Sequence, residues 1–244
     1  MSDTVNDAWH MLAPPVGDPH GPLAPLLLGL TVVTGLVDAF SYLVLGHVFV
    51  ANMTGNVVFL AFALAGAKGF SLVASALALV AFALGAAGSG RIVTHLGPRR
   101  GRVLAITATF EVAVTAAAVI IGWTVADPGV GASRYVLVIL LALGAGLQNG
   151  TARKLAVPDL TTTVLTQTIA GAAFESRAGG GANSRIGRRG LAAGAMFVGA
   201  LVGAVLELRV SRPLGLLVAL VLLAGVAGSA GRLSRGAPTW DDPL

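Results

Sequence analysis

The sequence predicts an all-α protein: a polytopic transmembrane helical bundle with about six spans plus two short broken or re-entrant helices, arranged as an inverted 3+3 repeat. Three observations predict this fold. Of the 244 residues, 55% are hydrophobic and 11% are charged, and the mean hydropathy is +0.84, far from the balance of a soluble domain. Long uncharged runs approach the roughly 20 residues that a helix needs to cross a bilayer core. Two stretches in which polar residues interrupt an apolar run share the same order of features.

Apolar runs and helix breakers divide the chain into eight segments. They cover residues 22–45, 48–66, 71–90, 103–124, 135–156, 160–174, 190–208 and 213–230. The transmembrane domain is therefore expected over 22–230, followed by a C-terminal tail over 231–244. Residues 1–21 contain no Lys or Arg, so they lack the positive region of a signal peptide, and we expect a disordered cytoplasmic tail there.

The repeat is seen in two stretches, "GLVDAFSYLVLGHVFVANMTGNVVFLA" and "GLQNGTARKLAVPDLTTTVLTQTIAGA". Each runs from a polar-interrupted helix through a short break into a segment rich in Thr or Asn. With a two-residue insertion in the second copy, Asp38 lies opposite Gln148 and Thr54 opposite Thr166. The repeat halves are then 22–126 and 134–230, an organisation known from transporters.

The sixth segment is too short to cross. Its 15 residues would make a helix of about 22 Å, against a core of about 30 Å, and it follows Pro158. If neither it nor the second segment crosses, twelve of the 16 basic residues share one side, the bias expected of a cytoplasmic face. Letting only the second segment cross gives an equally sharp split with the amino terminus outside. The repeat favours treating both alike, with both termini cytoplasmic in a bacterial inner (plasma) membrane.

Polar or non-helical backbone at membrane depth must be buried in protein or line a cavity, because lipid offers no hydrogen bonds. The stretch "HVFVANMTGN" is therefore expected to face the interior and to meet "VPDLTTTVLTQT" near the midplane, where inverted-repeat transporters hold their substrates. The candidate substrate-binding residues share polar side chains on these two stretches. They are Asp38, Asn52, Thr54, Asn56, Gln148, Asn149, Thr162 and Thr166.

Two readings of these residues stay open. Asp38 either lines a pathway as a proton or cation site, or it caps the broken end of the second segment or pairs with Arg153 or Lys154. The neutral residues either contact a solute or form interhelical hydrogen bonds. Glu111, inside the fourth segment, raises the same choice between a proton relay and a structural role.

Other chemistries are not expected. The chain has no cysteine, its four histidines are scattered, and no metal-ligand set or cofactor motif emerges. The basic residues lie in short clusters between apolar segments, which orients a membrane protein and gives no nucleic-acid surface. We therefore expect no catalytic residues, no metal and no cofactor. The expected partners are the lipid bilayer and a small polar solute or ion, and a homo-oligomer is left open.

The Val-Asp-Ala start at residue 37, the "ANMTGN" block and the "VPDLTTTVLT" block resemble the YoaK-like family, bacterial multi-pass membrane proteins classed as a domain of unknown function. The resemblance covers about 25–230 and implies six spans, with no established substrate, reaction or cofactor. The signature positions that it implies are Asp38, Asn52, Thr54, Gly55, Asn56, Gln148, Asn149, Pro158, Asp159, Thr161, Thr162 and Thr166. Gln167 departs from strict symmetry, because a Gly there would mirror Gly55.

The function that these features favour is a transporter or channel for a small polar solute or anion, with a polar site near the midplane. The alternative is a non-catalytic membrane scaffold or sensor in which the polar residues only hold helices together. An intramembrane enzyme is less favoured, because Ser41 or a threonine would need a nearby base and only Asp38 is at hand.

Overall fold

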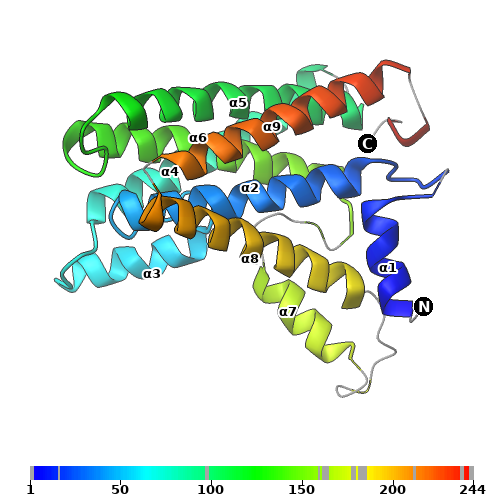
Figure 1. The fold of residues 1–244 in the computed structure, drawn as a ribbon, viewed down its shortest axis with the longest axis horizontal. Helices are drawn as coiled ribbons and strands as arrows, with labels where there is room; N and C mark the ends of the chain where they lie inside the picture. The colour runs from blue at the N-terminus through cyan, green and yellow to red at the C-terminus, as the bar shows by residue number, and fades with distance from the viewer. Residues whose placement is uncertain are drawn as a thin grey trace.

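The computed structural model describes residues 3–15, 17–96, 99–158, 160, 165–176, 180, 186–210, 213–236 and 239–241. The described chain forms a helical bundle (Figure 1). Its helices are α1 (Asp3–Leu12), α2 (Leu23–Val44), α3 (Met53–Leu64), α4 (Leu72–Leu96), α5 (Arg100–Thr124), α6 (Gly131–Leu155), α7 (Leu165–Phe174), α8 (Ile186–Arg209) and α9 (Leu214–Leu233), followed by the 3-10 turns η2 (Ser234–Gly236) and η3 (Thr239–Asp241). The predicted all-α fold class is confirmed.

Six of the described helices, α2, α4, α5, α6, α8 and α9, are long and apolar enough to cross a membrane. The other two in the transmembrane region are short: α3 has 12 residues and α7 has 10. At 1.5 Å per residue they extend about 18 Å and about 15 Å, well below the roughly 30 Å of a bilayer core. The prediction of six spans and two short helices is therefore confirmed.

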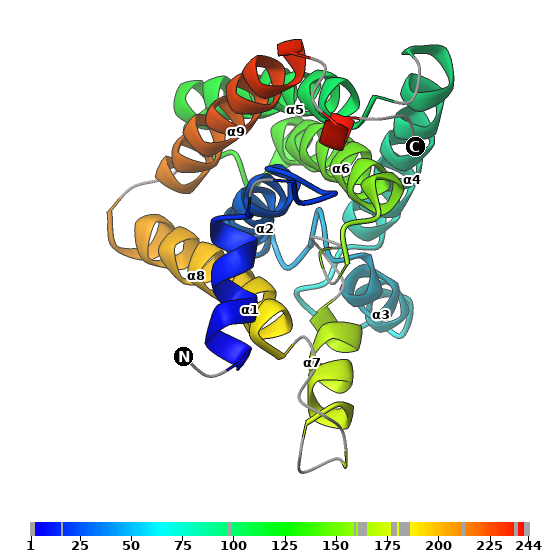
Figure 2. The same cartoon turned by 90° about the vertical axis from the view of Figure 1, so that its right-hand side faces the viewer.

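The packing of these helices follows a regular pattern. Helix α2 packs against α8, α4 packs against α6, and α5 packs against α9. Further contacts join α5 to α6, α2 to α9, α3 to α4 and α7 to α8. Seen end-on, α2 lies in the middle of the bundle between α6, α8 and α9 (Figure 2), and it is the most deeply buried of the six candidate spans.

Glycines make the two most extensive helix crossings possible. A Cβ on Gly35 of α2 would collide with the backbone of Met196 and Ala200 on α8, and one on Gly146 of α6 would collide with the carbonyl of Phe82 on α4. Because lipid is as apolar as a leucine side chain, close backbone approach and dispersion contacts replace the hydrophobic effect as the source of this packing.

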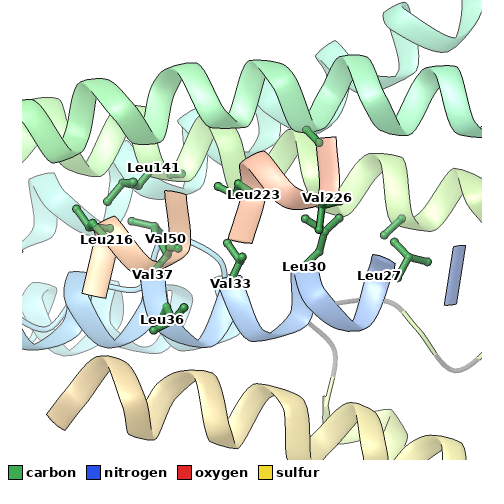
Figure 3. Packing of buried hydrophobic residues seen from close by; sticks show 14 of the residues in the cluster. Leu27, Leu30, Val33, Leu36, Val37, Val50, Leu141, Leu216, Leu223 and Val226 are labelled. Carbon is green, nitrogen blue, oxygen red and sulfur yellow. The ribbon is translucent and has the colours of Figure 1, made fainter. Parts of the chain in front are cut away.

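Apolar side chains fill the space around α2. Leu30 and Val33 on α2 point toward Leu223 and Val226 on α9 (Figure 3), and all four are buried. Figure 3 also shows Val50, from the segment after α2, beside Val37. This core fixes the rotation of α2 about its axis, and therefore the direction in which its polar residues point.

The amino-terminal segment differs from the expected disordered tail. Residues 3–12 form α1, which packs against α8 and buries Met11 to 1% exposure. Met11 supplies an apolar contact to the bundle, whereas Val5, Trp9 and Leu12 stay exposed, so the short helix is held by tertiary packing through one side. The sequence lacked a continuous apolar run here, and for that reason the helix was not predicted.

The carboxyl-terminal tail also contacts the bundle. Trp240 of η3 lies against Gly21 and Gly101, where a Cβ would meet its ring. Asp241 accepts a hydrogen bond from the backbone N–H of Gly101 at 2.5 Å, in the first turn of α5, where a carboxylate is favoured by the helix dipole. The segments before α2 and after α9 therefore meet at the same end of the bundle.

Candidate functional site

The candidate site is built on the turn that sends the chain back into the bundle after α2. Gly46 and His47 both have positive φ angles, of 82° and 56°. The carbonyl of Gly46 accepts from Arg134 Nη2 at 3.0 Å, and His47 Nδ1 lies 3.1 Å from the carbonyl oxygen of Gly69. Residues 48, 50 and 51 are buried, so the chain between α2 and α3 runs inside the protein.

Asp38 holds this returning segment. Its side chain is buried on α2, with 4% exposure, and Oδ1 accepts from the backbone N–H groups of Val50 at 3.0 Å and Ala51 at 2.9 Å. These amides immediately precede α3 and have no partner in a helix. Oδ2 is buried and has no hydrogen-bond partner among the described residues. Asp38 therefore closes the end of the broken helix, one of the two roles left open by the sequence.

The alternative ion pair of Asp38 is not formed. Arg153 and Lys154 are exposed at the end of α6, and neither lies within salt-bridge distance of a described carboxylate. The ion pair that the described residues do form joins Arg189 to Glu175 at 3.0 Å. The charge of Asp38, when present, is met by backbone amides alone.

Asn56 fixes the same returning segment by a second set of side-chain hydrogen bonds to backbone; we call these sets at Asp38 and Asn56 the locks. It is fully buried on α3, its Oδ1 accepts from the backbone N–H of Phe49 at 2.9 Å, and its Nδ2 donates to the carbonyl of the same residue. Phe49 in turn stacks on Tyr42 and Phe59. The amide of Asn56 is thus committed to the backbone of the returning segment.

The other candidates of the first stretch lie differently. Asn52 is half-buried at the N-cap position of α3, and its side chain makes no capping hydrogen bond. Thr54 is exposed, so the structure does not bring it to Asp38 and Asn56.

Gln148 joins three helices. It is buried on α6, with 3% exposure, and its amide lies 2.9 Å from Thr34 Oγ1 on α2. The other end of the amide lies 2.8 Å from Glu111 Oε1 on α5. Thr34 is one helical turn before Asp38 on the same face of α2, so a polar residue of the second half does reach the helix that carries Asp38.

Glu111 is the functional candidate that the predicted site omitted. It is buried on α5, with 6% exposure, and its contact with Gln148 crosses from one half of the chain to the other. The signal was present in the sequence as a carboxylate inside an apolar segment, but only the packing of α5 on α6 shows which residue it meets.

A cavity of about 720 Å³ opens between α4 and α6. Asn149, the residue after Gln148, lines it together with Phe82, Ala86, Ser89, Gly90, Val93, Thr94, Gly150, Arg153 and Lys154. Its charged lining residues are both cations, and the lining also includes polar side chains (Ser89, Thr94 and Asn149) and apolar ones. An anion or a small polar molecule suits such a lining.

The second predicted stretch is only partly described. Thr162, with Asp159, Thr161 and Thr163, lies outside the described residues. Thr166 is exposed in the first turn of α7, so the structure does not bring it to Gln148. Across the part of the chain that is described, no group of three His, Asp or Glu side chains could hold a metal ion.

Comparison with known proteins agrees with this membrane architecture. A family model described as "Protein of unknown function (DUF1275)" matches residues 26–229. The chain is similar to the UPF0700 transmembrane protein YoaK of Bacillus subtilis (strain 168), with 32% identity over 145 residues. That match covers 59% of the chain and 63% of the relative, so the chain spans less than two thirds of the relative's length. No solved structure matches the chain.

Proposed function

The chain belongs to the DUF1275 family, multi-pass membrane proteins of unknown function, and we propose from its own geometry that it is a transporter or channel for a small polar solute, with anions preferred. The observation that carries this proposal is the cavity between α4 and α6, lined by Asn149, Arg153 and Lys154. Two cations beside neutral hydrogen-bonding groups attract an anion and replace part of its hydration. Gln148 precedes Asn149 on α6 and contacts Thr34 on α2.

The packing pattern supports an inverted repeat. If α2–α5 correspond to α6–α9, the crossing of α2 with α8 corresponds to that of α6 with α4, and both are glycine-mediated. The contact of α5 with α6 likewise corresponds to that of α9 with α2, and α3 on α4 corresponds to α7 on α8. Such repeats move relative to each other around a site at their interface in many transporters.

We also propose that both termini are cytoplasmic in the inner membrane. With six spans, ten of the 13 basic residues that the structure describes lie at the end of the bundle that holds α1 and η3, the bias that the positive-inside rule expects of a cytoplasmic face. The cavity residues Arg153 and Lys154 belong to this group, so the cavity opens toward the cytoplasm.

Anion flux into proteoliposomes tests the transport proposal. Vesicles with the protein in their membrane are placed in the potassium salt of nitrate, formate or chloride, with valinomycin to carry the potassium. Swelling is followed by light scattering. Glycerol and urea serve as neutral solutes. We expect anion-dependent swelling that falls at least about tenfold in the Arg153→Gln/Lys154→Gln variant, since two favourable charges are removed. Arg102→Gln and Arg232→Gln, exposed arginines at the same end and outside the cavity, are the matched controls.

The competing function is a membrane scaffold or sensor without transport. The locks at Asp38 and Asn56 support it, because both side chains bind backbone of their own half. No swelling with any of the five solutes would favour it over transport. We propose no catalytic activity: Ser41 donates its hydroxyl to the backbone carbonyl of Asp38 at 3.2 Å, and the Asp38 carboxylate, the base considered for it, accepts from the N–H groups of Val50 and Ala51.

A further inference from the structure

Glu111 is a buried carboxylate without a cation. It is 6% exposed on α5, and no Lys, Arg or His of the described chain lies within salt-bridge distance of it. The helices around it carry their charges near their ends: Arg91 and His95 on α4, Arg134, Arg153 and Lys154 on α6, and Arg232 on α9. The other titratable groups on the helices described around it are Asp38 and Tyr42 on α2 and Tyr135 on α6, and Asp241 of η3 lies at the first turn of α5. An unpaired carboxylate in this position must bind a proton or find hydrogen-bond donors.

The contact that meets Glu111 is the amide of Gln148, which fits two orientations. In the first, Nε2 donates to Thr34 Oγ1 at 2.9 Å and to the carbonyl of Leu30 at 3.4 Å. The amide oxygen then faces Glu111 Oε1 at 2.8 Å. Two oxygens at this separation must share a hydrogen, so this orientation requires a protonated Glu111 that donates to Gln148.

The second orientation suits the ionised carboxylate. After a half-turn of the amide, Nε2 donates to Glu111 Oε1 at 2.8 Å and Oε2 at 3.2 Å, and the amide oxygen accepts from Thr34 Oγ1 at 2.9 Å. A carboxylate accepts only, and the amide nitrogen donates only. The first orientation therefore requires a protonated Glu111, and the second is the one that satisfies the ionised carboxylate.

The orientation of the Gln148 amide changes the hydrogen bond that Thr34 makes on α2. Its hydroxyl has one hydrogen. In the protonated state that hydrogen is donated to the carbonyl of Leu30 at 3.0 Å, whereas in the ionised state it is donated to Gln148. Proton uptake at Glu111 thus makes or breaks a side-chain bond on α2, one turn from Asp38.

We propose that Glu111, Gln148 and Thr34 form a proton-binding site that couples protons to the anion flux described above. The ligand is H⁺ from water, an O–H bond forms on Glu111, and no covalent bond of the protein breaks. The coupling rests on the proposed transport function. Proton binding itself does not, because it depends only on the three side chains. Asn149, which follows Gln148 on α6, lines the cavity between α4 and α6, and exchange of the proton with this cavity is part of the proposal.

Infrared difference spectroscopy of the full chain in lipid vesicles tests the site without any solute. We expect a carboxylic-acid C=O band that disappears as the pH rises and is lost in Glu111→Gln. Glu207→Gln is the matched control: Glu207 is also a buried glutamate in a spanning helix, accepting from the N–H of Gly215 at 3.1 Å, and its replacement should leave the band in place. Gln148→Leu removes the amide donor, so the band should persist to higher pH.

The outcomes separate the site from the transport. A titrating band whose amplitude is unchanged in Glu111→Gln, or no titrating band at all, overturns the proton site; a residual band that is lost in Asp38→Asn belongs to Asp38. The coupling is measured as the pH dependence of nitrate flux. In the unmodified protein the flux should change by up to about tenfold per pH unit beyond the midpoint of a single titration. In Glu111→Gln the flux should not depend on pH. Nitrate flux that keeps its pH dependence in Glu111→Gln overturns the coupling. Absence of all anion flux overturns the transport proposal while the infrared band still decides proton binding.

Discussion

The polar groups around Asp38 and those around Gln148 lie one helical turn apart along α2, yet they are bonded in different ways. Asp38 and Asn56 bind backbone groups within 13 residues of themselves, and their donors and acceptors fit in one way. Gln148 binds the side chain of Thr34, 114 residues away on α2, and the carboxylate of Glu111 on α5. Its amide fits these partners in two orientations. The first region fixes the backbone of a broken helix. The second links helices and can exchange a proton, so variants of the two regions should fail in different ways.

The largest loss of stability is expected from Asp38→Leu. Removal of the carboxylate leaves the buried N–H groups of Val50 and Ala51 without acceptors, which should lower the free energy of unfolding by about 3 kcal/mol or more. Equilibrium unfolding in mixed micelles measures it. Asp38→Asn keeps an acceptor oxygen and should lose only about 1 kcal/mol. If Asp38→Asn folds normally and abolishes anion flux, Asp38 is functional as well as structural.

Asn56→Leu should have the next largest effect. It removes both hydrogen bonds to the backbone of Phe49 and leaves that residue's N–H and carbonyl unpaired, at a cost of about 2 kcal/mol. Because the ring of Phe49 stacks on Tyr42 and Phe59, we also expect faster proteolysis between α2 and α3. Asn52→Ala, half-buried and without a capping bond, is the matched control, and equal losses in the two variants would contradict the lock.

A smaller effect is expected at Gln148 and Thr34. Gln148→Met and Thr34→Val each preserve most of the buried volume, and each should destabilise the protein by about 1 kcal/mol. Their hydroxyl–amide contact at 2.9 Å predicts a double-mutant coupling of about 0.5 kcal/mol or more. Additive losses would show that the two side chains do not share a bond. Unlike the Asp38 variants, these should alter the pH dependence of nitrate flux more than they alter folding.

The smallest effect is expected at the exposed threonines. Thr54→Val and Thr166→Val replace side chains that the structure places away from both regions, so each should change the free energy of unfolding by less than about 0.5 kcal/mol. Neither should reduce anion flux. A strong loss of flux in either variant would restore these positions to the pathway that the sequence predicts.

The sequence was most informative where a feature is local. The six long apolar runs and the short sixth segment depend on composition within a window of about 20 residues, which the bilayer thickness relates to a span. The second segment was expected not to cross only because of the repeat, and the structure shortens it to the 12 residues of α3. Asp38 and Asn56 were also found locally, because polar groups inside an apolar run must be satisfied by nearby backbone. Helix α1 was missed, since it is held by its contact with α8 and not by its own propensity.

The sequence by itself therefore determined that the chain is a helical membrane protein with six long apolar segments, and it left open whether the segment 48–66 also crosses; the 12 residues of α3 are too few to do so. Only the tertiary structure decided which polar side chains meet: Gln148 found Thr34 and Glu111, whereas Thr54 and Thr166 turned outward. The physical reason is rotation about the helix axis. Each residue turns the side chain by about 100°, so a small change in the phase of a short helix moves a threonine from interior to surface. That phase is set by glycine crossings and apolar packing far away in the chain.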